Sequence, residues 1–240
     1  MRTIAYIDGF NLYYRAIRKL NCKWLDLWSL VGASLPQGHE LIRIKYFTAQ
    51  VHELPDSPGS PERQRIYLAA LRNHIPNLDI VHGSFAVHAK CQRMLHPVGA
   101  LAKRDVLSRG KKAFVADLNC EVHAAKPEWA DDPGPPVHVI NMEEKGSDVN
   151  VAVHFLNDAW ANKADCFALV TNDSDLSEAA RIVSAELGKK VLLLTPEGTR
   201  PSMHLAKHVT DMRVIRKATF EKSMLPDPIP NTNIYKPPTW

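Results

Sequence analysis

Short apolar segments rich in β-branched residues recur along the chain, and each is bounded by turn-forming residues, as buried β-strands are. They predict strands at residues 3–7, 41–51, 78–87, 137–142, 166–171 and 190–195. Between several of these segments, apolar residues recur three or four positions apart, which is the spacing of an amphipathic helix. This spacing predicts helices at residues 11–20, 62–74, 148–160 and 175–187.

The helix predicted at residues 148–160 has the most regular apolar pattern of the four. Its apolar residues follow the i, i+3, i+4, i+7, i+11 rule, and they are Val149, Ala152, Val153, Leu156 and Trp160. Such a stripe is expected to face the core. We therefore expect Trp160, like Trp24 and Trp28, to be a core residue rather than a platform for base stacking.

Strands that alternate with helices predict an α/β fold with a mainly parallel central sheet. Right-handed crossovers would place helices on both faces of that sheet, in three layers. The 240 residues fit a single domain, and we find no boundary that divides the chain. Three stretches interrupt the alternation: an exposed loop marked by Pro55, Pro58 and Pro61, an irregular stretch at 90–136, and the last fifteen residues. Those fifteen contain five prolines and predict an extended tail that docks on the domain or stays loose.

The composition, 45% hydrophobic and 23% charged, is that of a soluble globular protein. No apolar run approaches the ~20 residues needed to span a bilayer. A carboxylate at Asp8 interrupts the N-terminal segment before a signal-peptide core could form. The four cysteines lack the spacing of a disulfide framework, so we expect a cytoplasmic protein with no membrane partner.

Basic residues are concentrated in one stretch of the chain. The overall formal charge is only +4, but residues 90–112 contain seven basic residues, Lys111 and Lys112 among them, and a single acid. A local surplus of this kind attracts a polyanion. It is equally typical of a solvated, flexible loop, and charge alone does not decide between the two interpretations.

Acidic residues follow the predicted strands or begin the predicted helices at three places. Asp8 ends the first strand, Asp173 and Asp175 follow the strand at 166–171, and Asp148 begins a helix. Parallel strands would bring these residues to the carboxyl edge of the sheet, where open α/β sheets bind ligands. Taken singly, each aspartate is explained by helix capping.

Together, however, these carboxylates would repel one another by about 4 kcal/mol per close pair at an effective dielectric near 20. A bound cation relieves such repulsion. Oxygen ligands without a paired histidine or cysteine favour Mg²⁺ or Mn²⁺ over zinc.

A divalent cation at such a site would activate water for attack on a phosphate ester. Asn11 offers an amide that could orient a water or a phosphate oxygen. Other polar residues of these segments could contact the substrate, and they are Arg15, Lys145, Asn172 and Ser174. Ordinary loop and cap contacts explain the same residues equally well.

Three ordered blocks carry a resemblance to a known family. They are DGFNLY at residues 8–13, EEKGSDVN at 143–150 and TNDSDL at 171–176. In order and spacing they resemble the NYN domains of the PIN-like nuclease superfamily, and the bacterial LabA-like branch above all. Segments at 43–49, 63–68 and 236–240 are similar as well, so the resemblance covers most of the chain.

This resemblance implies a PIN-like Rossmannoid fold that hydrolyses RNA with Mg²⁺ or Mn²⁺ as an endoribonuclease. It implies one domain over residues 1–215, with a basic insertion at about 88–135, followed by a proline-rich tail at 216–240. Asp8, Asp148, Asp173 and Asp175 match its metal-binding positions, and Asn11 matches its polar position after the first strand. We expect the insertion, through Lys111 and Lys112, to bind the RNA backbone.

Two alternatives remain, because PIN-like folds include inert members and the substrate class is open. One is a catalytically silent RNA-binding or regulatory module, and the other is an enzyme acting on DNA or on small phosphate esters. The sequence also leaves the oligomeric state open, a homo-oligomer included.

A weaker pattern lies within the insertion. His88 and Cys91 form an H-x-x-C pair, and Cys120 and His123 form a mirrored C-x-x-H pair. The two pairs could hold a structural zinc ion. With 11 histidines in the chain, pairs of this kind are expected by chance, and we favour chance.

Overall fold

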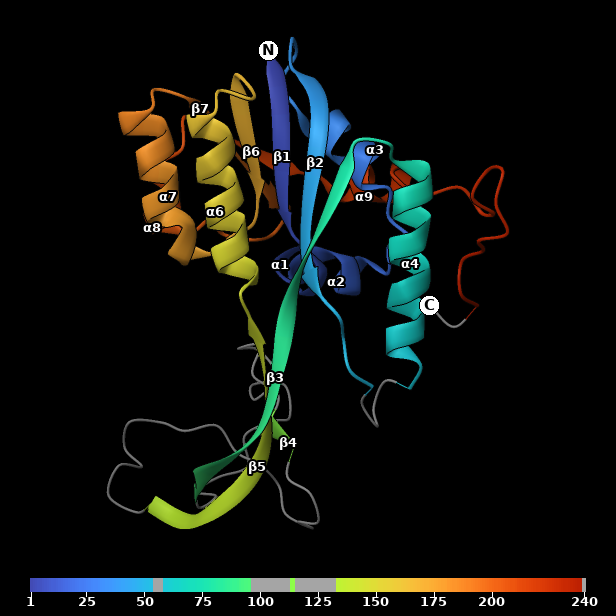
Figure 1. The fold of residues 1–240 in the computed structure, drawn as a ribbon, viewed down its shortest axis with the longest axis vertical. Coiled ribbons are helices and arrows are strands. Elements are labelled where there is room, and N and C mark those ends of the chain that lie inside the picture. Colours follow the sequence, from blue (N-terminus) through green and yellow to red (C-terminus); the bar gives the residue numbers. More distant parts are fainter. Residues whose placement is uncertain (54–57, 96–112, 115–132, 239–240) are drawn as a thin grey trace. The chain divides into compact units, whose positions relative to one another are not determined.

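The computed structural model describes residues 1–53, 58–95, 113–114 and 133–238, with the side chains of residues 86–143 left out. The chain divides into two compact units. The first joins Met1–Gly83 to Gly146–Trp240, and the second is Ser84–Lys145. Each unit is described by itself below (Figure 1).

The first unit is built on a parallel sheet. Its strand order is β3-β2-β1-β6-β7-β8, and every adjacent pair is parallel. The strands are β1 (Arg2–Asp8), β2 (Glu40–Ala49), the start of β3 (Leu78–Leu95), β6 (Cys166–Val170), β7 (Lys190–Pro196) and β8 (Asp211–Ile215). The strand order reverses between β1 and β6, where Ile7 pairs with Val170. This reversal is the switch point at which open α/β sheets bind ligands.

Helices cover both faces of this sheet (Figure 1). One layer contains α1 (Gly9–Leu12), a π-turn (Tyr13–Ile17), α2 (Arg18–Leu20), α3 (Leu27–Ser34), α4 (Ser60–His74) and α9 (Lys217–Lys222). The opposite layer contains α6 (Ser147–Trp160), a 3-10 turn (Ser174–Leu176), α7 (Ser177–Arg181), a π-turn (Ile182–Glu186) and α8 (Met203–Ala206). Side chains of β1 alternate between the two cores, as the pleat of a strand requires. Ile7 packs into the first core and Tyr6 into the second.

The second unit contains antiparallel strands. The later part of β3 pairs with β5 (Pro133–Lys145), and β5 pairs with β4 (Ala113–Phe114). The expectation that residues 90–136 are irregular is therefore wrong at both ends, because 90–95 and 133–136 lie in strands. Their pairing joins segments about forty residues apart, and no local periodicity reveals such a partner.

The predicted α/β fold with a mainly parallel sheet is confirmed, and its layers agree with a PIN-like Rossmannoid sandwich. The predicted strands and helices are all present, with ends shifted by a few residues except in β3 and β5. Pro61 lies in the first turn of α4 rather than in a loop, a position that tolerates its missing N–H. The elements absent from the prediction are short, and they are α3, α8, α9, β4 and β8.

The C-terminal segment packs on the first unit. Within the predicted tail, Phe220 of α9 is fully buried, and Ile229 is 1% exposed. The indole N–H of Trp24, which is buried as predicted, donates to the carbonyl oxygen of Pro226 at 3.1 Å. Residues 217–229 thus help to cover the sheet.

The face that α6 turns to the core is only partly the predicted one: Ala152 and Leu156 pack against the core, but the other three residues of the predicted stripe are exposed. Val149, Val153 and Trp160 are 64%, 56% and 79% exposed. The expectation that Trp160 is a core residue is therefore wrong. The buried side chains of α6 are instead Ser147, Val151, Phe155, Asp158 and Ala159. Two of these are polar, so apolar periodicity could not locate the centre of the buried face.

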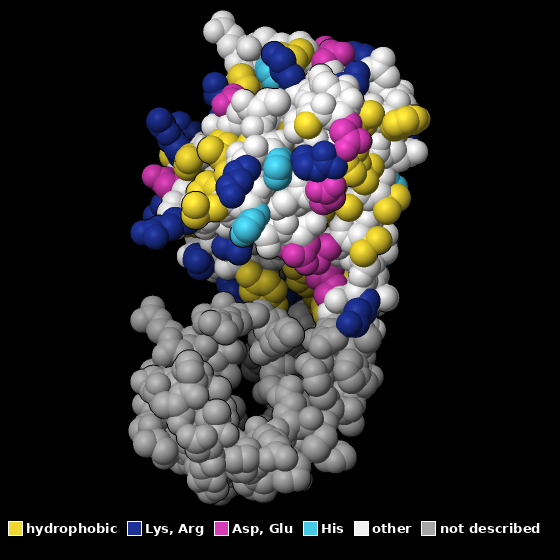
Figure 2. Space-filling view, turned by 90° about the vertical axis from the view of Figure 1, so that its left-hand side faces the viewer, with side chains coloured by type: hydrophobic (Ala, Val, Ile, Leu, Met, Phe, Trp, Pro, Cys, Tyr) yellow, Lys and Arg dark blue, Asp and Glu magenta, His cyan; other side chains and the backbone are white. Residues whose placement is uncertain are grey.

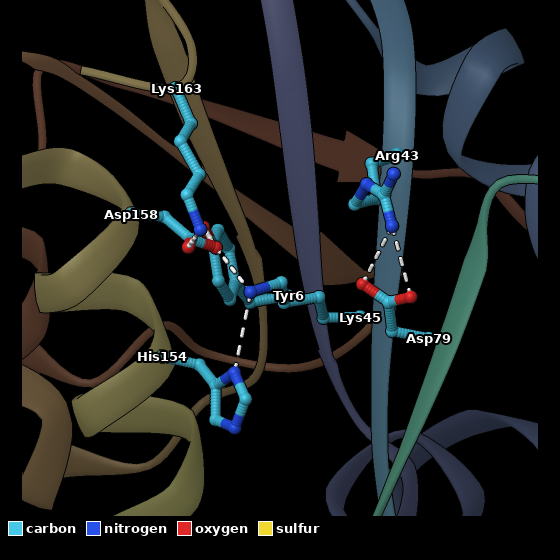
Figure 3. A network of polar contacts seen from close by, with 7 residues as sticks. All are labelled: Tyr6, Arg43, Lys45, Asp79, His154, Asp158 and Lys163. Carbon is cyan, nitrogen blue, oxygen red and sulfur yellow. Dashed lines mark hydrogen bonds and ion pairs between the residues drawn. The ribbon is translucent and has the colours of Figure 1, made fainter. Parts of the chain in front are cut away.

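Asp158 can be buried because it is fully partnered (Figure 3). Its side chain has no exposed surface and accepts hydrogen bonds from the Tyr6 hydroxyl at 2.8 Å and from Lys163 Nζ at 2.8 Å. The Nζ atom of Lys45 lies 2.5 Å from the same Asp158 oxygen that accepts from Tyr6, and 3.3 Å from Nδ1 of His154. Burial opposes ionisation of Asp158, but its hydrogen bonds outweigh burial and hold its pKa below the usual value. The network fastens α6 to β1 and β2.

We expect Asp158→Asn to destabilise the protein by about 3–5 kcal/mol, because it leaves the buried ammonium of Lys45 without its carboxylate. Lys163→Ala is the matched control, because the Lys163 side chain is half exposed and its loss should cost at most about 1 kcal/mol. Urea denaturation of the two variants beside the wild type measures both values. Equal, small losses would show that the network does not hold α6.

Candidate metal centre

Asp8 stands at the junction of β1 and α1, next to the strand-order reversal. Its carboxylate accepts a hydrogen bond from the backbone N–H of Asn11 at 2.9 Å, and so caps α1. The side chain is only 6% exposed. The capping role considered for this aspartate is thus present, and it fixes the orientation of the carboxylate.

Gly9 allows α1 to begin directly against β2. A Cβ atom at this position would lie 2.7 Å from the carbonyl oxygen of Phe47 and 2.8 Å from the ring of Tyr46. The Phe47 oxygen belongs to the backbone of a buried strand, which cannot move aside. The absence of a side chain at Gly9 is therefore what allows α1 to turn so close to the end of β1.

The backbone of Asp173 is tied to the Asp8 carboxylate through Thr171. The Thr171 hydroxyl donates to Asp8 at 3.2 Å and accepts from the backbone N–H of Asp173, also at 3.2 Å. Asp173 in turn accepts from the backbone N–H of Asp175 at 3.0 Å, which caps the short 3-10 turn. Thr171 was not among the predicted site residues. Its position at the end of a strand, close in sequence to Asp173 and Asp175, could have identified it as a site residue.

Asp148 lies in the first turn of α6, just after Gly146, which has a φ of 88°. Among the described residues, Asp8, Asp148 and Asp173 each offer one carboxylate oxygen, and these oxygens lie within 4.8 Å of one another. Asp175, the fourth predicted ligand, is outside this group and exposed. The structure therefore brings three of the four predicted aspartates together.

Burial, and then the proximity of other carboxylates, raises the pKa values of Asp8 and Asp148. Burial is the largest cause for Asp8, and the charges of Asp148 and Asp173 add to it. The hydrogen bonds from Asn11 and Thr171 act in the opposite direction, and the resulting pKa of Asp8 is about 6. Burial and the charges of Asp173 and Asp175 also raise the pKa of Asp148. A divalent cation would favour the ionised forms, and this all-oxygen donor set fits Mg²⁺ or Mn²⁺.

Asn172 connects its own loop to α1 and to the loop at residues 200–202. Its backbone N–H donates to Oδ1 of Asn11 at 3.1 Å. Its side-chain amide donates to the carbonyl of Arg200 at 2.6 Å and accepts from the backbone N–H of Ser202. Asn172 is 8% exposed, so its described contacts are with the protein rather than with solvent. These contacts hold the Asp173 loop against α1.

The other predicted site residues are placed as follows. Arg15 and Ser174 are exposed on the first unit, and Lys145 ends β5 in the second unit. Lys111 and Lys112 lie outside the described residues, as do the side chains of the zinc candidates His88, Cys91, Cys120 and His123. Contacts of these residues with substrate or zinc stay predictions.

No helix in the described part of the chain is long and apolar enough to cross a membrane.

Three comparisons relate the chain to known proteins. Residues 108–213 match the NYN domain family, and the match includes Asp148 and Asp173 but not Asp8. The chain is 28% identical over 214 residues to 6-hydroxy-3-succinoylpyridine 3-monooxygenase HspA of Pseudomonas putida (strain DSM 28022 / S16). That alignment covers 82% of this chain and 60% of the relative. A crystal structure of a protein of unknown function from Vibrio parahaemolyticus RIMD 2210633 is 15% identical, with a TM-score of 0.48, and covers 89% of this chain and 92% of that one.

The LabA-like branch within the family stays a prediction. The segment that supplies Asp148 and Asp173 is thus similar to the NYN domain family.

Proposed function

We propose that this protein is a metal-dependent endoribonuclease that hydrolyses RNA phosphodiester bonds at the aspartate cluster. One observation carries the proposal: Asp8, Asp148 and Asp173 converge within 4.8 Å at the switch point of a parallel sheet. Clustered carboxylates are costly without a cation, and oxygen ligands of this kind suit Mg²⁺ or Mn²⁺. The family match supports a nuclease, and the choice of RNA is our inference.

The three aspartates would hold a divalent ion, which supplies a water of lowered pKa and neutralises charge on the phosphate. Asp8 is suited to act as a fixed ligand, because Asn11 and Thr171 set the orientation of its carboxylate. Asp173 is restrained through the same threonine. Restraint of this kind reduces the reorganisation needed when substrate binds.

The remaining residues fall into two groups. Oδ1 of Asn11 accepts a hydrogen bond from the backbone N–H of Asn172. We therefore assign Asn11 mainly a positioning role, which is to hold the Asn172 loop, and a smaller role in contacting the substrate. Arg15 and Ser174 are exposed and available for contacts with phosphate, and Asp175 is available as a further ligand. We retain Lys145, Lys111 and Lys112 as proposed contacts for the RNA backbone.

A second candidate function is oxygenation of an aromatic substrate, and the similarity to the Pseudomonas monooxygenase favours it. This chain spans only 60% of that relative. The donor set among the described residues is three carboxylates, whereas non-haem iron oxygenases use two histidines and one carboxylate. Hydrolysis is therefore the better supported function. Oxygen uptake with 6-hydroxy-3-succinoylpyridine and a nicotinamide reductant tests the alternative.

Asp173→Asn should lower the rate of RNA cleavage by about 100-fold or more, because it removes a charged ligand from the cluster. The measurement uses labelled single-stranded RNA with Mn²⁺ or Mg²⁺, beside DNA and a small phosphodiester. Chelation should stop cleavage, and added Mn²⁺ should restore it.

The matched control is Asp165→Asn, since Asp165 pairs with Arg2 at the opposite end of the strands and should not affect cleavage. RNA left intact by the wild type and by Asp173→Asn alike would contradict the proposal. If RNA were still bound without a metal-dependent product, the protein would be a silent binding module.

Asp8→Asn should stabilise the metal-free protein at pH 8 while it abolishes cleavage. The pKa of Asp8 is raised in the folded state, from 3.8 to about 6, so its stabilising contribution is present at low pH and is lost as the pH rises through about 6. Asparagine does not reproduce all the hydrogen bonds of the Asp8 carboxylate, which reduces the gain. We therefore expect the free energy of unfolding at pH 8 to rise by about 1–2 kcal/mol, and the melting temperature by roughly 2–6 °C.

Thermal melts with chelator at pH 4.5 and pH 8 provide the measurement. The difference between variant and wild type should be small at pH 4.5 and should shrink at pH 8 when Mn²⁺ is added, because the cation stabilises only the wild type. A variant that is less stable than the wild type under both pH conditions would show that Asp8 is not destabilised by its neighbours.

A further inference from the structure

Helix α6 is apolar on two faces, although its inner face alone suffices to pack it on the sheet. The inner face contains Val151 and Phe155, which are fully buried. The outer face contains what we call the α6 ridge, formed by Val149, Val153 and Trp160, which are exposed, and at its edge by Leu156, which is partly buried against the core. Trp160 is 79% exposed, more than any other large hydrophobic side chain among the described residues. A surface helix ordinarily has one apolar stripe, and a second stripe indicates a second packing partner.

The spacing of the ridge indicates what kind of partner it fits. Its residues are separated by four, three and four positions, which is the seam of a coiled coil. Such a seam packs side by side with another helix, its side chains entering the spaces of the facing seam. In Figure 2, hydrophobic side chains recur down the right-hand margin, the side on which α6 lies.

The ridge is also free of charge. Between Asp148 and Lys163, the charged side chain of Asp158 is buried against the sheet, and His154 is turned toward Lys45 (Figure 3). Single-stranded RNA binding requires cations along its phosphates. Lys163, the nearest lysine at the end of α6, is already paired with Asp158. The ridge thus favours a protein helix over a nucleic acid.

We propose that the α6 ridge is the interface between two copies of this chain, packed antiparallel across a two-fold axis. In this arrangement Trp160 of each copy lies opposite Val149 of the other, so that a large side chain meets a small one. Val153 meets Leu156 near the axis. The N-terminal end of each α6 then faces the C-terminal end of its partner, so that the two helix dipoles are antiparallel.

The area of the ridge is compatible with a reversible dimer. A tryptophan buries on the order of 200 Å², and one ridge offers about 400 Å² of apolar surface. Two ridges with their flanking polar side chains approach the lower end of specific interfaces, about 1,200 Å². Because small interfaces are weak, we expect a dissociation constant on the order of 1–10 μM.

Sedimentation of the full chain from about 1 to 100 μM tests the proposal. The wild type should pass from monomer to dimer over this range, and Trp160→Glu should stay monomeric, with a dissociation constant raised at least tenfold. The matched control is Met203→Glu, because Met203 is 77% exposed on α8 and lies off the ridge. This control should associate as the wild type does. Circular dichroism checks that both variants are folded, as expected for substitutions at exposed positions.

A charge-pair experiment tests the antiparallel register. Val149→Lys and Trp160→Glu should each be monomeric alone, whereas their mixture should form a heterodimer, because the ammonium introduced in one chain would meet the carboxylate introduced in the other. Failure of the mixture to associate would overturn the antiparallel arrangement.

A wild type that is monomeric at 100 μM, or a Trp160→Glu variant that associates normally, would overturn the interface itself. A monomeric wild type whose RNA affinity falls in Trp160→Glu would assign the ridge to nucleic acid instead. None of these outcomes depends on whether the aspartate cluster cleaves RNA, so this inference stands or falls separately from the proposed function.

Discussion

The mutual repulsion of three carboxylates is the constraint around which this end of the molecule is organised. Asp8, Asp148 and Asp173 come from β1, α6 and the loop after β6, and the sheet brings their oxygens within 4.8 Å. The fold holds them there at a cost, because burial, and then the charges of Asp148 and Asp173, raises the pKa of Asp8 to about 6. The hydrogen bonds of Thr171 and of the Asn11 N–H offset part of that cost. Such an arrangement is intelligible if a cation is its normal occupant.

The helix that supplies Asp148 must be held firmly for this cluster to keep its geometry. Asp158 lies about 15 Å further along α6 and is bound to Tyr6 and Lys45 of the two central strands. One end of the helix therefore contributes a ligand while the other is fastened to the sheet. On the outward face of the same helix, Val149, Val153 and Trp160 are exposed.

Much of this arrangement follows from the sequence. Strand periodicity locates the central strands, and the rule that parallel strands share a carboxyl edge predicts the meeting of Asp8, Asp148 and Asp173. The prediction could not separate Asp175 from this group, because Asp173 and Asp175 lie only two residues apart at the start of the same short 3-10 helix. It also could not find the partner of β3 in β5, since strand pairing over forty residues leaves no local pattern. The error at α6 has a similar origin: Asp158 is buried by three polar partners, and hydrophobicity alone places such a residue outside.

The central claim is that the three aspartates form a site for a divalent cation. A crystal of the protein soaked in Mn²⁺ and measured for anomalous scattering tests this claim most directly. We predict a peak within bonding distance of the carboxylates of Asp8, Asp148 and Asp173. Full soaking with no peak at these three residues, or a peak held by other side chains alone, would contradict the account.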